Sequence, residues 1–322
     1  MVKISVIMPT YNTEIQMLQE AVNSILNQTF QDFEFIIIND GSTNGTGAYL
    51  KSIRDKRIKI IHNQKNIGIT KSLNIGLENA NGQYIARMDA DDISLPTRFE
   101  RQYLFMESHP DVVMCGATVQ NFAANNKSHI TRINDMDYYR IKTLFYYPGP
   151  VHPTMFIRHQ TLLEHKIAYD ESLAYAQDYD LCEKISITGG KIVILPEILL
   201  HRRVHTSRIT NKYYEKQKQC SIVTQKRLLL ELLGSVTDDE LALHYRFSYE
   251  KVFHSLSDFS KCLTWYLKLI NANNHVRKYP RKKFAFFAMK LLMLITIQNT
   301  VIKAGHTFRS KRKSTRQTTS SK

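Results

Sequence analysis

Apolar residues in the N-terminal part of the chain change repeatedly between strand spacing and helix spacing. Residues 2–8 and 33–38 are apolar runs of strand length, whereas residues 15–26 place apolar side chains three and four positions apart. The same change recurs between residues 58–61 and residues 69–80. Alternation of strands and helices with short connections is typical of a sheet covered by helices on both faces. We therefore predict an α/β domain with a mostly parallel sheet and flanking helices.

Polar residues gather where three of the predicted strands end. These segments are Thr10-Tyr11-Asn12, Asp40-Gly41-Ser42 and Asp89-Ala90-Asp91-Asp92. Because ligands of parallel α/β sheets bind beyond the carboxyl ends of the strands, we expect the three segments to share one site. The carboxylates of Asp89 and Asp91, one residue apart, can reach the same divalent cation, which would neutralise a phosphate-bearing leaving group. An acidic cluster in a loop is also often only solvated surface.

Positive charge is concentrated at the C-terminal end of the 322-residue chain. The net charge is +15, and residues 271–322 contain 13 Lys and Arg but no Asp or Glu. The rest of the chain is therefore near neutral, and the basic segment suggests contact with a polyanion, either a membrane surface or nucleic acid. The four cysteines lie far apart without a CxxC pair. This argues against a zinc site or a disulfide framework and fits a reducing cytoplasm.

The chain becomes helical in character from about residue 213 onward, rich in Leu, Tyr, Phe and Lys. We predict a domain of residues 1–210, a helical region of residues 211–308 and a basic, disordered tail of residues 309–322. Residues 284–297 are apolar with Lys290 in their middle, too short and too polar to span a bilayer. This segment is either an amphipathic helix on an anionic membrane or a core helix packed on the N-terminal domain. The basic flanks favour the membrane.

Five motifs follow one another along the N-terminal part of the chain. They are SVIMPTYN at residues 5–12, NDGS at 39–42, the NIG pair at 66–76, ARMDADD at 86–92 and LPTR at 95–98. Their order and spacing resemble those of family 2 glycosyltransferases of the GT-A fold, over about residues 3–210. The resemblance implies a Rossmann-like GT-A domain of bacterial polysaccharide type. It also implies an inverting enzyme that moves a sugar from a nucleotide sugar, a UDP-sugar, to a glycan or lipid-linked glycan.

The resemblance assigns several residues to the nucleotide of the donor. Pro9, Thr10 and Tyr11 match the end of the first strand, which frames the base, and Asp40 matches a carboxylate that hydrogen-bonds the base. Lys71 lies where relatives often place a basic residue near the nucleotide. Many relatives carry arginine where this chain has leucine at position 73, and this departure weakens the match at Lys71.

The resemblance also implies a divalent cation, Mn²⁺ or Mg²⁺. Asp91 matches its principal ligand, and Asp89 matches a residue that contacts ribose or the metal. Further along, the segment Arg202-Arg203-Val204-His205 resembles an Arg-x-His element, in which an arginine faces the phosphates and the histidine completes the metal shell. We assign the phosphates to Arg202 and the metal to His205.

Two residues are similar to those on the acceptor side of such enzymes. Asp178 matches the general base, which takes the proton of the acceptor hydroxyl as its oxygen attacks the anomeric carbon. The chain has Gln177 before it, where relatives usually carry an acidic residue. Asp178 could instead cap the following helix. His152, in a Val-His-Pro-Thr element, matches a residue adjacent to the acceptor.

Two other functions compete with glycosyl transfer. A sugar-phosphate nucleotidyltransferase would need a glycine-rich basic loop after the first strand, where this chain has residues 9–12. A non-enzymatic nucleic-acid-binding protein would explain the basic tail, but no nucleic-acid motif accompanies it. We expect as partners a nucleotide-sugar donor, a glycan or lipid-linked acceptor and an anionic membrane surface, but no nucleic acid. We expect a cytoplasmic protein, peripheral on the inner face of the membrane.

Overall fold

The computed structural model describes residues 2–122, 128–129, 133, 135–203, 214–251, 253 and 255–318. The chain divides into two compact units. Unit 1 comprises Met1–Met136 and Pro148–Ser221, and unit 2 comprises Asp137–Tyr147 and Ile222–Lys322. This division differs from the predicted boundary near residue 210, because a short helix within the N-terminal part belongs to the core of unit 2.

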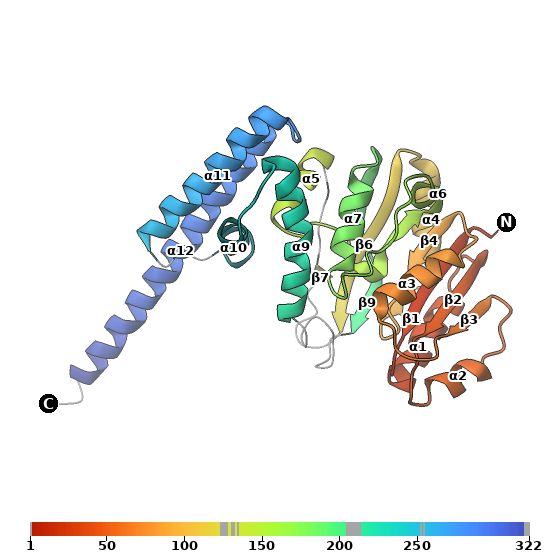
Figure 1. Ribbon diagram of the computed structural model, residues 1–322. Coiled ribbons are helices and arrows are strands. Elements are labelled where there is room, and N and C mark those ends of the chain that lie inside the picture. Colours follow the sequence, from red (N-terminus) through yellow and green to blue (C-terminus); the bar gives the residue numbers. More distant parts are fainter. Residues whose placement is uncertain are drawn as a thin grey trace. The chain divides into compact units, whose positions relative to one another are not determined.

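Unit 1 is built on one mixed sheet (Figure 1). Its strands are β1 Ile4–Thr10, β2 Phe33–Asn39, β3 Ile58–His62, β4 Tyr84–Arg87, β5 Ile93–Ser94, β6 Val112–Phe122, β7 Ser128–His129, β8 Phe156–Arg158 and β9 Lys191–Arg203. The order is β3-β2-β1-β4-β8-β6-β9-β5, with β7 paired to β6. The pairs from β3 to β4 are parallel, while β8 runs antiparallel to both of its neighbours. The predicted α/β class is confirmed, and the sheet is parallel over its N-terminal half.

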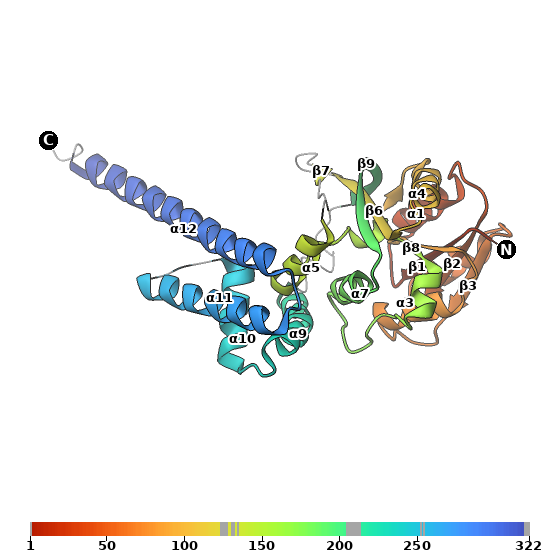
Figure 2. The same cartoon turned by 90° about the horizontal axis from the view of Figure 1, so that it is seen from above.

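Helices cover both faces of this sheet. They are α1 Ile15–Leu26, α2 Thr46–Ser52, α3 Ile69–Glu78, α4 Arg98–Ser108, α6 His159–Glu164, α7 Gln177–Ser186 and the 3-10 helix η1 His152–Thr154. Figure 2 shows α1 and α4 on one face and α3 and α7 on the other. Ile4, Val6 and Met8 of β1 face the core under α1. Ile7 points to the opposite face, where Gly76 lets α3 approach so closely that an added Cβ would lie 2.4 Å from Ile7.

Unit 2 is helical, as the sequence predicts. Its elements are α5 Met136–Phe145, α9 Tyr214–Leu233, α10 Asp238–Tyr245, the π-helix η2 Arg246–Glu250, α11 Leu256–Val276 and α12 Arg281–Thr318. Phe145 of α5 packs in one core with Leu228, Trp265 and Phe284, which explains why α5 belongs here.

The long helix α12 differs from the sequence prediction. It continues to Thr318, past residue 309, where we predicted a disordered tail. Lys, Arg and Gln are good helix formers, and residues 309–318 contain no proline or glycine. No helix within the described residues is both long enough and apolar enough to cross a membrane.

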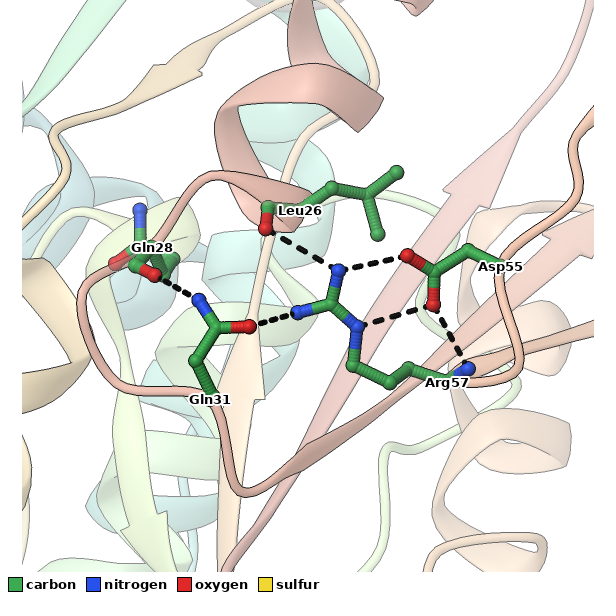
Figure 3. A network of polar contacts seen from close by, with 5 residues as sticks. All are labelled: Leu26, Gln28, Gln31, Asp55 and Arg57. Atoms are coloured by element: carbon green, nitrogen blue, oxygen red, sulfur yellow. Dashed lines mark hydrogen bonds and ion pairs between the residues drawn. The ribbon is translucent and has the colours of Figure 1, made fainter.

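A polar network in unit 1 joins the end of α1 to the loop before β3 (Figure 3). Arg57 donates to the Asp55 carboxylate from Nε at 3.0 Å and from Nη2 at 2.7 Å. It also donates to Gln31 Oε1 at 2.5 Å and to the Leu26 carbonyl at 3.3 Å. Its guanidinium carbon lies 4.6 Å from the ring centre of Phe33. The hydrogen bond from Arg57 lowers the pKa of Asp55 from its ordinary value of 3.8 to about 2.

Replacing Asp55 by asparagine tests this network. We expect Asp55→Asn to lower the free energy of unfolding at pH 7 by about 1 kcal/mol, because a two-pronged, charge-assisted contact is lost. Since the folded pKa is depressed, the stabilisation is complete above the unfolded value of 3.8 and is lost as the pH falls through about 2. Urea unfolding followed by circular dichroism at neutral and acidic pH measures both effects.

Asp111→Asn is the matched control for this experiment. Asp111 pairs with Lys191 at 2.6 Å, but both side chains are more than half exposed. Exposed pairs contribute little to stability, so the control should lose less than Asp55→Asn. Equal losses in the two variants would contradict a special role for the Arg57 network.

Candidate active site

The ends of β1 and β2 form one wall of the site. Pro9 and Thr10 are buried, whereas Tyr11 is 49% exposed. Asn12, with φ 49°, accepts hydrogen bonds on its side-chain oxygen from the backbone N–H groups of Thr43 at 2.8 Å and Asn44 at 3.3 Å. The two loops that follow these strands are therefore held together at the carboxyl edge of the sheet.

Asp40 is buried at the end of β2 and organises the loop after β3. Its Oδ1 accepts from Asn63 Nδ2 at 2.8 Å and from the Ile67 N–H at 3.0 Å, and its Oδ2 accepts from the Gly68 N–H at 2.9 Å. A carboxylate accepts about four hydrogen bonds, so capacity for one more remains. Gly41 follows with φ 69°, and a Cβ there would lie 2.4 Å from the backbone of residue 65. The close approach of these loops therefore requires glycine.

Asp89, Asp91 and Asp92 follow β4 and gather their carboxylates. One oxygen from each lies within 4.8 Å of the others, and within the described part of the chain this is the only such group of His, Cys, Asp or Glu. Carboxylate oxygens are the ligands that Mg²⁺ and Mn²⁺ prefer, so the donor set fits a divalent cation. Asp89 and Asp91 are partly exposed, whereas Asp92 is buried and its Oδ1 accepts the Arg203 N–H at 2.9 Å.

Arg203, at the end of β9, holds this carboxylate loop from the side. Its Nε donates to the carbonyl oxygen of Asp91 at 3.0 Å, and its guanidinium pairs with Glu20 of α1. Arg202, which the resemblance assigns to the donor phosphates, donates from Nε to Asn121 Oδ1 at 2.8 Å. Arg202 and Arg203 are neighbours on β9, and neighbouring residues of a strand point to opposite faces. The resemblance includes Arg203 in the Arg-x-His segment, but its contact with the carboxylate loop was not predicted from the sequence.

Arg87 is a buried cation directly beneath the carboxylates. It is 3% exposed and forms an ion pair with Asp89. Its carbonyl oxygen accepts a hydrogen bond from Nη2 of Arg98, a second buried arginine, at 2.7 Å. A buried guanidinium requires a compensating charge, and Asp89 supplies it. The sequence analysis did not single out Arg87. The available signal was a charged residue at the end of the apolar strand Tyr-Ile-Ala.

Asp178 lies in the first turn of α7, just after Ala176 in the left-handed conformation. Its Oδ1 accepts the N–H of Tyr179 at 2.9 Å. Desolvation by the surrounding protein raises the pKa of Asp178, while the positive charge of Arg87 opposes the shift and the negative charge of Asp89 adds to it. The charges of both Arg87 and Asp89 therefore act on Asp178, although an edge of its side chain reaches solvent.

His152 and Tyr169 form a buried, uncharged pair beside this group. His152 Nε2 lies 2.9 Å from the Tyr169 hydroxyl. Burial, aided by the positive charge of Arg87, lowers the pKa of His152 well below 6.5, so its ring is neutral at pH 7. Burial also raises the pKa of Tyr169, which therefore keeps its proton. The charge of Arg87 thus also acts on His152, whose expected place near the acceptor stays a prediction.

The segment before α7 is anchored to α3. Asn74 donates to the carbonyl oxygen of Tyr169 at 3.0 Å and accepts the Tyr169 N–H at 3.0 Å. Thr70 donates to the carbonyl oxygen of Leu173 at 2.7 Å. These bonds fix the chain that leads to Asp178. They also explain the second asparagine of the NIG pair as a structural residue.

Two expected residues remain. Lys71 is exposed at the start of α3. His205, the expected metal ligand after β9, lies outside the described residues.

Comparison with known proteins identifies the family. Residues 5–166 match the model of glycosyl transferase family 2. The chain belongs to this family. An uncharacterised glycosyltransferase of Haemophilus influenzae is 34% identical over 247 residues, or 73% of this chain and 76% of the relative. The amylovoran biosynthesis glycosyltransferase AmsE of Erwinia amylovora is 32% identical, over 65% of this chain and 79% of its own length. The resemblance seen in the sequence is thus confirmed.

Solved structures share the fold of this family 2 glycosyltransferase. Residues 1–349 of Staphylococcus aureus TarS, in complex with UDP-GlcNAc, align with a TM-score of 0.63 at 17% identity, covering 92% of each chain. The match spans 54% of a longer TarS chain. A mannosyltransferase from Pyrobaculum calidifontis, in complex with GDP-Man and Mn²⁺, aligns at 0.57 with 15% identity over 93% of this chain and 87% of that one. The GT-A fold class is thereby confirmed.

Replacing Arg203 tests its hold on the carboxylate loop. We expect Arg203→Met to weaken Mn²⁺ binding about tenfold, because the loss of its hydrogen bonds lets the Asp89–Asp92 loop relax. Titration with Mn²⁺, followed by the electron paramagnetic resonance signal of free ion, measures the change. Arg202→Met is the matched control and should bind Mn²⁺ like the parent. Unchanged affinity in Arg203→Met would mean that the loop holds its shape without this arginine.

Proposed function

We propose that this protein is an inverting glycosyltransferase that moves a sugar from a UDP-sugar to a hydroxyl group of a glycan or lipid-linked glycan. The observation that carries the proposal is the electrostatic coupling of Asp178 to Arg87 and Asp89, which form an ion pair. A base candidate from α7 and a metal-ligand candidate from the end of β4 interact electrostatically, although 89 positions separate them in the sequence. A transferase needs both groups near the same anomeric carbon. The acceptor oxygen attacks this carbon from the side opposite to the departing phosphate.

In the proposed reaction, Asp178 acts as the general base. The acceptor oxygen attacks the anomeric carbon while its proton moves to the Asp178 carboxylate. The bond between that carbon and the phosphate oxygen breaks at the same time, so the nucleoside diphosphate leaves and the configuration inverts. The raised pKa of Asp178 supports this role, because it brings a carboxylate closer to the strength of an effective base. The neighbouring Arg87 cation still favours the ionised form that can accept a proton.

The donor side is assigned to the loops at the carboxyl edge of the sheet. Asp89 and Asp91 would hold a divalent cation, Mn²⁺ or Mg²⁺, which neutralises the charge that develops on the diphosphate. Tyr11 offers an exposed ring beside the base site, and Asp40 retains capacity to accept a hydrogen bond from uracil. The complexes of the two structural relatives with UDP-GlcNAc and with GDP-Man and Mn²⁺ support a nucleotide-sugar donor and a metal.

The acceptor is proposed from the name of one relative of this chain. AmsE, one of its relatives, carries amylovoran biosynthesis in its name, which supports a glycan acceptor. A lipid-linked glycan would require the enzyme to work at the inner face of the membrane. We propose a cytoplasmic, peripheral location, supported by the basic C-terminal segment.

Competing functions have less support. The family match and the carboxylate site favour glycosyl transfer over nucleotidyl transfer, because residues 9–12 offer no basic phosphate loop. A nucleic-acid-binding role would not explain the buried cluster of charged groups around Arg87.

A donor screen with Asp91→Asn tests the donor and metal assignment. We expect one nucleotide sugar, from a set that includes UDP-GlcNAc and GDP-Man, to be hydrolysed or transferred in the presence of Mn²⁺ or Mg²⁺. Asp91→Asn should lower that rate about 100-fold or more, since several kcal/mol of charge stabilisation depend on the metal. Asp111→Asn is the control: it precedes β6 and therefore lies at the opposite edge of the sheet. Full activity in Asp91→Asn would sink the metal assignment.

Asp178→Asn separates donor binding from transfer. The variant should bind the nucleotide donor like the parent but lose transfer by about 100-fold or more, because no group accepts the acceptor proton. In the parent, activity should fall as the pH drops through the raised pKa of Asp178, so the acidic limb lies above 3.8. Calorimetry and a pH–rate profile measure the two effects. Retained transfer in Asp178→Asn would assign the base to another residue.

A further inference from the structure

Helix α12 is apolar on two opposite faces. One face packs into the core of unit 2 through Phe284, Ala288, Leu291 and Ile295. The opposite face carries a second apolar row, here called the apolar stripe, which consists of Phe286, Met289, Met293 and Ile297. These side chains are between 41% and 61% exposed, and they recur at the three- and four-residue spacing of one helix face. A contiguous exposed row of large apolar side chains marks a surface that another body covers.

The surroundings of the apolar stripe are positively charged. Lys282 and Lys290 are exposed and lie four residues before Phe286 and seven before Ile297, on the same side of the helix. Residues 301–318 continue α12 with six Lys and Arg and no Asp or Glu. The helix therefore combines an apolar row with lysines beside it and with basic residues farther along the chain, a combination suited to a membrane interface.

An open, shallow depression lined by cationic side chains, here called the cation-lined cavity, lies at the N-terminal end of the same helix. Its volume is about 480 Å³, and its lining includes Arg140, Arg277, Lys278 and Arg281 together with Asp137. Asp137 is neutralised by Lys283 at 2.6 Å, and Lys278 is paired with Glu231.

Three arginines of the cavity wall take no part in these ion pairs. Neither Arg140 nor Arg277 forms an ion pair within the described part of the chain. Arg281 donates only to a backbone carbonyl, that of Asn274, at 2.5 Å. The first turn of α12 contains no acidic residue, so its N–H groups add a partial positive charge. Guanidinium groups and helix N-termini together are suited to a phosphate group.

We infer that unit 2 docks on an anionic phospholipid membrane, with the apolar stripe of α12 inserted among the acyl chains and the cation-lined cavity holding a lipid phosphate. A second copy of the chain would bring two strongly basic α12 helices together, and like charges repel. Nucleic acid would match the charge but would leave the apolar stripe in water. An anionic bilayer alone satisfies both features. The inference rests on the peripheral location within the proposed function and names the surface that produces it.

Vesicle binding of the full-length protein tests the inference. The parent should sediment with vesicles of phosphatidylcholine containing phosphatidylglycerol, and much less with phosphatidylcholine alone. Phe286→Ser/Met293→Ser/Ile297→Ser should lower the partition coefficient by at least about tenfold, through lost apolar insertion. Arg140→Gln/Arg277→Gln should lower it roughly tenfold and weaken its dependence on salt, because two charges leave the surface.

Matched controls separate docking from folding. Val223→Ser/Leu230→Ser/Leu267→Ser removes equally exposed apolar side chains from α9 and α11 and should leave vesicle binding unchanged. Thermal unfolding should be similar in all three multiple variants, because every replaced side chain lies at the surface. Equal loss in the control and stripe variants would overturn the assignment to α12. So would a stripe variant that binds vesicles like the parent but changes from dimer to monomer in light scattering.

Donor turnover in solution distinguishes this inference from the proposed reaction. The stripe and cavity variants should keep metal-dependent turnover of the donor with a soluble acceptor or water. If the parent turned over a donor but did not bind vesicles, membrane docking would be refuted and the proposed transfer would stand. Vesicle binding without turnover of any donor would defeat the proposed transfer and leave the docking surface in place.

Discussion

The buried positive charge of Arg87 is the constraint on which the catalytic unit depends. A guanidinium removed from water is unstable unless carboxylates and carbonyl groups surround it. The ion pair with Asp89 meets this need, and at the same time it fixes the loop whose carboxylates suit a metal. The same charge adds to the burial that keeps His152 neutral, and it opposes the rise that desolvation causes in the pKa of Asp178. Strand β4, η1 and α7 therefore contribute to one electrostatic unit.

Much of the fold of unit 1 follows from apolar periodicity. Residues 15–26 were predicted from their helical spacing and form α1 with the same bounds. The ends of strands were harder to predict. The first strand was predicted over residues 2–8, yet β1 continues through Pro9 to Thr10, and Pro9 lies opposite Ile38 in the parallel pair.

The candidate site was predictable where chemistry depends on residue type, and not where it depends on orientation. Carboxylates at predicted strand ends pointed to Asp89 and Asp91, and the structure gathers one oxygen of each with one of Asp92 within 4.8 Å. Arg202 and Arg203 are identical in type, and only the phase of β9 decides which of them faces the carboxylate loop. Arg87 was not predicted as a site residue, because the sequence does not distinguish a buried arginine from an exposed one. Its importance comes entirely from burial.

The same limit applies to α12. The sequence left open a helix on an anionic membrane or a core helix packed on the N-terminal domain, and the core that α12 joins is that of unit 2. A helix can pack in a core and lie on a membrane when both of its faces are apolar, and α12 divides its large side chains between the two. The sequence shows only that residues 284–297 are apolar. The core takes Phe284 and leaves Phe286 in solvent, because positions two apart point to nearly opposite sides of a helix. Lys290, on the exposed side, makes passage through a bilayer costly but suits its charged surface.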